Sequence, residues 1–574
     1  EDFDLVVVGF HKSNAHPWKP YEFSNQELVW LHEIARKNKT ILAVFASPYS
    51  LLNIKSFTNL EAVLVAYQNS EIAQEITAQT IFGAIEASGK LPISIKNEFP
   101  VGTGIITKSL QRLQYSIPEA VGMSSKKLAR IDSVATVVLE EKMSPGLQVL
   151  VARKGVVVYE KSFGYHTDKK KNPVKNSDVY DVASLTKILA SLPMLIKAEE
   201  EKKIALSSSV RKIIPRFKKS NKDTVTVQEV LSHYGQLKAW IPFYKLTQDS
   251  ITNKNLKKFY RAKKTKNFTI KVAENLYLKS SYKDSIYKYI RDAEQREKPG
   301  YKYSDLGYYI FKEALEKRYK KDLNVLVDDE FYKPLGANRM SYLPLAKFDK
   351  LSIVPSEKDS YFRHQLLHGY VHDMGAAMLG GVGGHAGLFA NSNDVAKMMQ
   401  LYLQKGYYGG KRYFKAATFN KFNIIYAPGH TLDHVVLCDH ENNLLFVGDV
   451  LFRLGCGRVF EGTLEQMQNS LLKLFNLSDG MLVYCGHEYT VSNLEFAKTV
   501  EPLNKNIISS YNNALNLQNN NIPTLPTFLS SELKINPFLR SDIKEVQANI
   551  IEKFKTDKDE EEIFTAIRKW KDNF

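Results

Sequence analysis

A chain of 574 residues is too long to fold around a single hydrophobic core, and this constrains its structure more than any other feature. We therefore expect several domains. The content of 44% hydrophobic and 25% charged residues is that of an ordinary globular protein. Apolar runs such as 188–196 are short and soon meet charged residues, so the sequence predicts no membrane span.

The formal net charge of +17 does not indicate a nucleic-acid partner, because the lysines are spread along the chain and not concentrated on one element. The three cysteines are Cys438, Cys456 and Cys485, so no disulfide framework supports the rest of the chain. The chain starts at Glu1 and runs directly into a strand-like segment. No signal peptide can therefore be read, which leaves room for an upstream part.

Short apolar runs alternate with helical stretches in residues 1–112. Strands are expected at 5–8, 40–45 and 62–66, with helices at 25–36 and 70–87 between them. This alternation favours a small parallel α/β layer. The segment 88–96 and the helix before it resemble the C-terminal α/β domain of family three glycoside hydrolases. The nucleophile of that family lies in a preceding barrel that is absent here, so the resemblance implies a module without glycosidase chemistry of its own.

A Ser-x-x-Lys motif opens an apolar helical run in the second segment, residues 113–420. Ser184 and Lys187 are three residues apart, which places both side chains on one face of a helix. A lysine amine among apolar groups gives up its proton more readily and can activate a serine hydroxyl for attack. Tyr303 follows in a Tyr-Ser-Asp sequence and could relay a proton to a leaving group.

These motifs resemble the serine β-lactamase and penicillin-binding-protein superfamily, especially its class C β-lactamase and esterase branch. The likeness includes a hairpin predicted across Lys154 and Gly155 and the segment 384–389. It implies that Ser184 is the acylated nucleophile, with its backbone amide as one oxyanion donor. It further implies that Lys187 is the activator and Tyr303 the general base.

This segment departs from that family in two places. Asp305 stands where the second motif usually has Asn, which makes an ester or amide a better substrate than an anionic β-lactam; the alternative is that Asp305 caps the helix that follows it. The third motif and the late strands of the family are missing. We interpret the sequence His-Ala-Gly at 385–387 as a structural loop, and expect the sheet to lack its later partners.

The composition changes at 424–430, and the third segment, residues 421–574, carries further motifs. His430, Asp449 and His487 each lie at an expected junction between a strand and a loop. The surrounding sequences resemble glyoxalase II, the hydroxyacylglutathione hydrolase of the metallo-β-lactamase fold. The resemblance implies that His430 binds one metal, His487 the other and Asp449 both, with zinc or iron as the metal.

The same resemblance implies a glutathione-binding group made of Arg458, Tyr489, Arg568 and Lys571. Cys456 and Cys485 have no paired ligand spacing and are expected to be packing residues. The first ligand cluster of the family is missing from the chain, so the predicted zinc site is incomplete.

The fold class predicted for the whole chain is therefore mixed α/β and α+β, in three segments that resemble a fusion of hydrolase pieces. Three hypotheses remain open: a serine acyl hydrolase acting through Ser184, a zinc-dependent hydrolase of hydroxyacylglutathione thioesters, and a catalytically inactive scaffold. The expected partner is a small acyl or thioester substrate, including a glutathione conjugate. The first two segments favour a periplasmic location and the third a cytoplasmic one.

Overall fold

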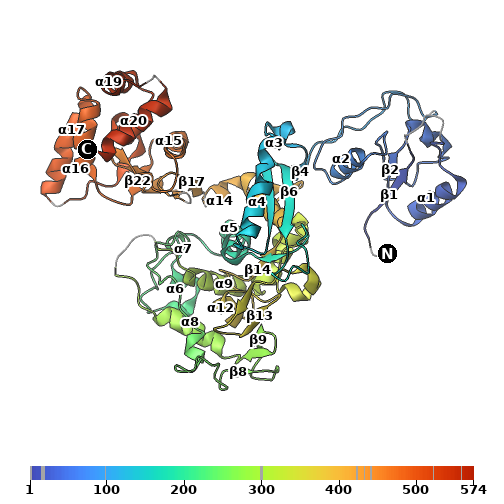
Figure 1. Ribbon diagram of the computed structural model, residues 1–574, viewed down its shortest axis with the longest axis horizontal. Coiled ribbons are helices and arrows are strands. Elements are labelled where there is room, and N and C mark those ends of the chain that lie inside the picture. The colour runs from blue at the N-terminus through green and yellow to red at the C-terminus, as the bar shows by residue number, and fades with distance from the viewer. Residues whose placement is uncertain are drawn as a thin grey trace. The chain divides into compact units, whose positions relative to one another are not determined.

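The computed structural model describes residues 3–13, 20–96, 98–297, 302–421, 424–431, 434–439, 443–520, 522–556 and 559–574. Its helices and strands, drawn in chain order in Figure 1, form a multidomain fold of mixed α/β type, as predicted. The chain divides into two compact units, each built from separate stretches of sequence. The first comprises Glu1–Met194, Pro242–Ile286 and Leu315–Tyr413, and the second comprises Leu195–Ile241, Tyr287–Ala314 and Phe414–Phe574.

A small parallel sheet forms the N-terminal part of the first unit (blue in Figure 1). Its strands β1 (Val6–His11), β2 (Thr40–Phe45) and β3 (Ala62–Val65) lie in that order and are all parallel. Helix α1 (Asn25–Lys37) connects β1 to β2, and α2 (Glu71–Ile81) follows β3; each starts after a serine whose side chain caps the first turn. This arrangement confirms the α/β layer that the sequence predicts.

A long hairpin follows in the same unit. Strands β5 (Gly146–Arg153) and β6 (Val156–Gly164) are antiparallel, and β4 (Gln114–Tyr115) pairs with the other edge of β6. The turn residues Lys154 and Gly155 have φ angles of +52° and +79°, the left-handed geometry that suits a two-residue hairpin turn. In the described part of the chain this sheet has the order β4-β6-β5, with β5 at one edge.

A second three-stranded sheet positions the Ser-x-x-Lys motif. Strand β14 (Leu388–Ala390) lies between β11 (Ser341–Tyr342) and β7 (Tyr180–Asp181) and is antiparallel to both. After β7 the chain makes a 3-10 turn at Ala183–Leu185 and a π-helical turn at Lys187–Ser191, and then enters α5 (Leu192–Glu200). The motif therefore lies at the start of a helix, as predicted.

Further elements of the first unit surround these sheets. The helices are α3 (Ser125–Leu128), α4 (Arg130–Glu140), α10 (Leu323–Val327), α11 (Lys333–Leu335), α12 (Met374–Met378) and α13 (Ser392–Leu403). The strands are β8 (Tyr260–Arg261), β9 (Ile270–Ala273), β10 (Leu276–Leu278), β12 (Glu357–Asp359), β13 (Gln365–Leu367), β15 (Tyr407–Tyr408) and β16 (Lys411–Arg412). Three helices, α5, α8 (Tyr282–Asp292) and α9 (Leu306–Tyr319), run across the sequence boundaries of the units.

The second unit contains a five-stranded sheet in the order β17-β18-β19-β22-β23. Only β19 and β22 are parallel to each other. The strands are β17 (Ile424–Tyr426), β18 (Val435–Asp439), β19 (Leu444–Gly448), β22 (Leu482–Cys485) and β23 (Thr527–Phe528).

Helices cover one face of this sheet and form the core of the second unit with it. Val447 and Val483 of the sheet and Met467 and Phe564 of the helices are fully buried in one apolar cluster. The helices that follow this sheet's first strands are α15 (Leu464–Leu472), α16 (Thr490–Val500), α17 (Lys505–Asn519), α18 (Leu529–Ile535), α19 (Lys544–Phe554) and α20 (Glu560–Asp572). The second unit also contains α6 (Val210–Ile213), α7 (Val227–Leu231), α14 (Ala416–Asn420), β20 (Leu451–Phe452) and β21 (Gly455–Cys456). None of the helices that the structure describes is long and apolar enough to cross a bilayer.

Candidate functional site

Ser184 lies on an exposed turn whose backbone is held by Asp181. One carboxylate oxygen of Asp181 accepts a hydrogen bond from the amide of Ala183 at 2.9 Å, and the other accepts one from the amide of His372 at 2.7 Å. Ala183 itself has a φ of +45°, an uncommon conformation for a residue with a side chain. Asp181 thus fixes the strained turn that presents Ser184. Burial raises the pKa of Asp181, although the two amides lower it.

The amine of Lys187 meets the hydroxyl of Ser184, as their spacing predicts. Lys187 Nζ lies 2.9 Å from Ser184 Oγ. Lys187 is only 4% exposed, beside the fully buried Leu189 and Ala190, whereas Ser184 is exposed. The arrangement places an accessible hydroxyl against an amine that is shielded from water, which is what a serine nucleophile and its base require.

The glycine-rich loop at 380–387 also contacts Lys187. The backbone carbonyl of His385 accepts from Lys187 Nζ at 3.4 Å. A side chain at Gly387 would place its Cβ 2.4 Å from the carbonyl oxygen of Gly381, so the loop can close only with glycine there. Residues 385–387, predicted from the sequence to be a structural loop, therefore also lie beside Ser184 and Lys187.

The second motif lies in the second unit. Tyr303 is 41% exposed, and its ring centroid is 4.7 Å from that of His233. The amide of Ser304 donates to Nδ1 of His233 at 3.2 Å, and the hydroxyl of Ser304 donates to the carbonyl of Lys238 at 2.7 Å. These bonds fix the motif within its unit. Tyr303 and Ser184 belong to different units, so the proton relay between them stays a prediction.

Asp305 stands immediately before α9, in the position of a helix N-cap. Its backbone amide donates to the carbonyl of Ala239 at 2.9 Å. The amide of Leu306 donates a hydrogen bond to the hydroxyl of Ser304 at 3.2 Å. The position agrees with the alternative of a capping residue, and a role of Asp305 in substrate selection stays a prediction.

The predicted metal ligands converge on one carboxylate in the second unit. Asp449 Oδ2 lies 3.4 Å from Nε2 of His430 and 3.6 Å from Nε2 of His487. Nδ1 of His430 is bonded to the carbonyl of Arg458 at 2.8 Å, which turns Nε2 toward Asp449. His434, to which the sequence analysis gave no role, accepts from the amide of Asp449 at 3.1 Å.

This group does not make a complete metal site. Across the described ranges, no set of three or more His, Cys, Asp or Glu side chains has an arrangement that could hold a metal ion. Three donors also fall short of the ligands that two metals need. His487 is half exposed and stacks on Tyr489, with ring centroids 5.3 Å apart.

Two of the four predicted glutathione-binding residues, Arg458 and Arg568, meet at Asp572. Arg568 donates to Asp572 at 2.9 Å, and Nε of the exposed Arg458 lies 3.5 Å from the same carboxylate oxygen. Arg568 is only 3% exposed and also donates to the carbonyl of Cys456 at 2.8 Å. Burial lowers the pKa of Lys571, and both arginines add to that effect. Contact of Arg458, Tyr489, Arg568 and Lys571 with glutathione stays a prediction.

The three cysteines are free thiols. Cys438 and Cys456 are buried and Cys485 is partly buried, in agreement with packing roles. Burial raises the pKa of Cys456, and it raises that of Cys485 to about 11. Neither thiol is thereby activated as a nucleophile.

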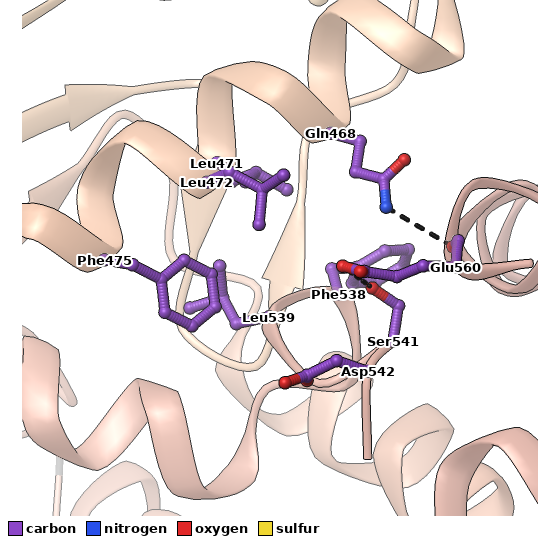
Figure 2. Close-up of a pocket in the computed structure, with 9 residues that line it drawn as sticks. All are labelled: Gln468, Leu471, Leu472, Phe475, Phe538, Leu539, Ser541, Asp542 and Glu560. Carbon is purple, nitrogen blue, oxygen red and sulfur yellow. Dashed lines mark hydrogen bonds between the residues drawn. The ribbon is translucent and has the colours of Figure 1, made fainter. Parts of the chain in front are cut away.

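A cavity of about 200 Å³ lies in the second unit. Figure 2 shows the residues that line it. Two hydrogen bonds cross it, from Gln468 Nε2 to the carbonyl of Glu560 at 3.3 Å and from Ser541 Oγ to the carboxylate of Glu560 at 3.4 Å. It shares no residue with either predicted site and therefore does not locate them. Its lining residues are Gln468, Leu471, Leu472, Phe475, Phe538, Leu539, Ser541, Asp542 and Glu560.

Curated relatives match the C-terminal part of the chain. The hydroxyacylglutathione hydrolase of Shewanella denitrificans is 47% identical over 152 residues, which cover 26% of this chain and 58% of the relative. The corresponding protein of Bartonella tribocorum is 49% identical over 147 residues, covering 26% and 57%. The chain thus spans less than two thirds of the length of these relatives.

Solved structures of low identity also resemble the chain. An octameric penicillin-binding protein homologue from Pyrococcus abyssi has a TM-score of 0.40 and 18% identity, covering 54% of this chain and 65% of its own. A class C beta lactamase from Rhodobacter sphaeroides has a TM-score of 0.38 and 12% identity, covering 54% and 76%.

Three family models match consecutive parts of the sequence. The model described as hydroxyacylglutathione hydrolase C-terminus matches residues 488–574, and that of the metallo-beta-lactamase superfamily matches 413–487. The model described as Beta-lactamase matches residues 131–431. This last match spans more than half of the 574 residues and includes Ser184, Lys187 and Tyr303. The chain therefore belongs to the Beta-lactamase family.

Proposed function

We propose that this protein is a serine acyl hydrolase that forms an acyl-enzyme on Ser184. The substrate class is an ester or amide of a small carboxylic acid. The single observation that carries the proposal is the 2.9 Å contact between the exposed hydroxyl of Ser184 and the buried amine of Lys187. A serine needs such a partner because its hydroxyl is a weak nucleophile while it keeps its proton.

In the proposed reaction, Ser184 Oγ attacks the carbonyl carbon of the substrate while its proton passes to Lys187 Nζ. The carbonyl electrons move to the oxygen, which the backbone amide of Ser184 stabilises. The bond to the leaving group then breaks, and Tyr303 gives its proton to that group and takes back the proton held by Lys187. A water molecule then hydrolyses the acyl-enzyme: its hydroxide part adds to the acyl carbon and its remaining proton returns to Ser184 Oγ. In this scheme Lys187 accepts the serine proton first, and Tyr303 relays it to the leaving group.

The preference for a neutral substrate rests on Asp305. Asp305 stands where the second motif of these enzymes usually has Asn, and a carboxylate at that position repels an anionic substrate. We therefore propose a neutral ester in preference to a penicillin, whose carboxylate would meet this charge.

The experiment that tests the proposal is covalent labelling with a fluorophosphonate probe. The wild type is expected to gain one probe adduct on the peptide that contains Ser184, and Ser184→Ala is expected to gain none. Ser177→Ala is the matched control, because Ser177 is an exposed serine in the same unit. Labelling that persists in Ser184→Ala at the wild-type rate would refute the proposal.

A second candidate function is hydrolysis of a hydroxyacylglutathione thioester. It is favoured by the 47% identity of the C-terminal part to a hydroxyacylglutathione hydrolase and by the approach of His430 and His487 to Asp449. Zinc is the metal that this donor set suits. Because the three donors fall short of a complete site, we propose that this activity requires ligands from another polypeptide.

We propose that the chain is a fusion of three domains, residues 1–112, 113–420 and 421–574. The N-terminal α/β layer then serves as an accessory module of the kind found in family three glycoside hydrolases. Its support is the parallel order β1-β2-β3 together with the sequence of segment 88–96. Expression of residues 1–112 alone tests this assignment, because a module of that origin is expected to fold and to cleave no glycoside.

A further inference from the structure

A histidine held by an aspartate carries the carbonyl that Lys187 contacts. Nε2 of His385 is 2.8 Å from Oδ1 of Asp373, and the side chain of His385 is only 2% exposed. Asp373 also accepts from the amide of Ala376 at 2.6 Å, which ties it to the start of α12. The imidazole is therefore held by a carboxylate that is itself anchored to a helix.

The loop that carries His385 is held at two further points. The hydroxyl of Ser191 donates to the carbonyl of Gly384 at 2.7 Å, and that of the buried Tyr342 donates to the carbonyl of Gly383 at 2.7 Å. The carbonyl of His385, which accepts from Lys187, thus belongs to a backbone with three independent attachments. The loop therefore sets the direction of the His385 carbonyl, and Lys187 does not.

The segment that carries Asp373 also supports the other side of the nucleophile. The amide of His372, one residue before Asp373, donates to Asp181, which holds the turn of Ser184. The guanidinium of Arg363 donates to the carbonyl of His372 at 2.6 Å. One short segment therefore connects the support of Ser184 to the support of Lys187.

The neighbours of Asp373 set the pKa of its carboxyl group. Burial alone would raise the pKa of Asp373, but the nearby His385 and Lys187 and the amide of Ala376 lower that pKa to about 2. Asp373 is therefore a carboxylate at neutral pH and attracts the ammonium that Lys187 becomes when it accepts a proton.

We propose that Asp373 and His385 are positioning residues for Lys187, which direct its amine toward Ser184 through the carbonyl of His385. This inference rests on the proposed function. A neutral amine has one lone pair and two N–H groups, so an N–H bound to a fixed carbonyl limits where the lone pair points. When Lys187 has accepted the proton of Ser184, its three N–H groups can still donate to this carbonyl and to the Ser184 oxygen.

The test compares variants of similar size that keep or lose the polar contact. His385→Gln retains a nitrogen that can donate to Asp373, whereas His385→Met does not. Asp373→Asn retains an acceptor for His385, whereas Asp373→Leu does not. Each full-length variant is measured for the rate of fluorophosphonate labelling, for kcat and KM with p-nitrophenyl acetate, and for its thermal unfolding midpoint.

We expect His385→Met and Asp373→Leu to lower the labelling rate and kcat by about 10²-fold, because a shift of about 1 Å in a reacting group has effects of that size. KM should change little. The Gln and Asn variants should recover most of the lost rate, at unfolding midpoints close to those of their apolar counterparts. Equal rates in the polar and apolar variants of each pair would overturn the proposal.

Crystal structures of His385→Gln and His385→Met separate this inference from the proposed function. The positioning role predicts that the contact between Lys187 Nζ and Ser184 Oγ persists in the Gln variant and is lost in the Met variant. If the wild type is never labelled on Ser184 but the contact behaves as predicted, the proposed function fails and the positioning role stands. If the wild type is labelled and the contact survives in both variants, the positioning role fails alone.

Discussion

Lys187 Nζ lies 2.9 Å from Ser184 Oγ, and the carbonyl of His385 is a second acceptor for the same amine. The serine is open to a substrate, while the lysine is almost completely buried. In the proposed reaction the exposed hydroxyl of Ser184 meets the substrate, and the buried amine of Lys187 accepts the proton of that hydroxyl. The predictions that follow depend on this relationship and on its neighbours.

Replacing Lys187 by Met should remove the proton acceptor and leave an apolar side chain of similar length in its place. We expect the rate of fluorophosphonate labelling to fall by about 10² to 10⁴-fold, the usual contribution of a general base. The unfolding midpoint should not fall, because an apolar side chain of similar length fills the same buried space. A wild-type labelling rate in this variant would show that another group activates Ser184.

Replacing Tyr303 by Phe tests the proton relay. We expect kcat for p-nitrophenyl acetate to fall by about 10²-fold or more while the protein stays folded, because only the phenol oxygen is removed. Tyr289→Phe is the matched control, since Tyr289 is another exposed tyrosine of the second unit. Equal losses in the two variants would assign the effect to packing and not to catalysis.

The thioester hydrolase hypothesis predicts measurable metal binding. Purified protein incubated with zinc should retain the metal after gel filtration only when the missing ligands are supplied, and Asp449→Ala should then retain less. The readouts are zinc content by mass spectrometry and release of glutathione from S-lactoylglutathione. Turnover that is the same in Asp449→Ala and in the wild type would remove this hypothesis.

Much of the fold could be predicted from local sequence patterns. The hairpin of β5 and β6 follows from alternating residues on either side of Lys154 and Gly155, which take the left-handed conformations that the turn requires. The parallel layer follows from apolar runs that alternate with helical ones. The meeting of Ser184 and Lys187 follows from their spacing of three residues.

The surroundings of the nucleophile could not be predicted in this way. Asp373 and His385 lie in a loop-rich stretch without periodicity, and their contact with the helix start depends on β14 pairing with β7. No local pattern encodes a pairing between strands so far apart in sequence. The contact that buries Arg568 against Cys456 also joins residues far apart in sequence, so no local pattern predicts it.

The ion pair of Asp359 and Arg363 should be important for the stability of the first unit. Both side chains are fully buried, and their contact is 2.6 Å. We expect Arg363→Met to lower the free energy of unfolding by about 3 to 5 kcal/mol, because a buried carboxylate is left without its partner. Urea unfolding measures the effect. Lys161→Met, which removes an exposed pair with Asp132, is the control and should change the free energy of unfolding far less.

The same pair predicts a dependence of stability on pH. Burial alone would raise the pKa of Asp359, but Arg363 and the amides of Phe362 and Tyr361 lower it. An aspartate whose pKa is lower in the folded state stabilises the fold above its unfolded pKa of about 3.9. This stabilisation should be complete above about pH 5 and should be lost as the pH falls through the folded-state pKa. If the free energy of unfolding of Arg363→Met depends on pH between pH 5 and pH 3 as that of the wild type does, this assignment is wrong.

The most direct measurement of the central claim is the intact mass of the protein after reaction with a fluorophosphonate, followed by identification of the modified peptide. The account predicts one adduct per chain, located on Ser184, formed in the wild type and in Ser177→Ala and absent from Ser184→Ala. Folded wild-type protein that gains no adduct, or gains it on another residue, would contradict the claim.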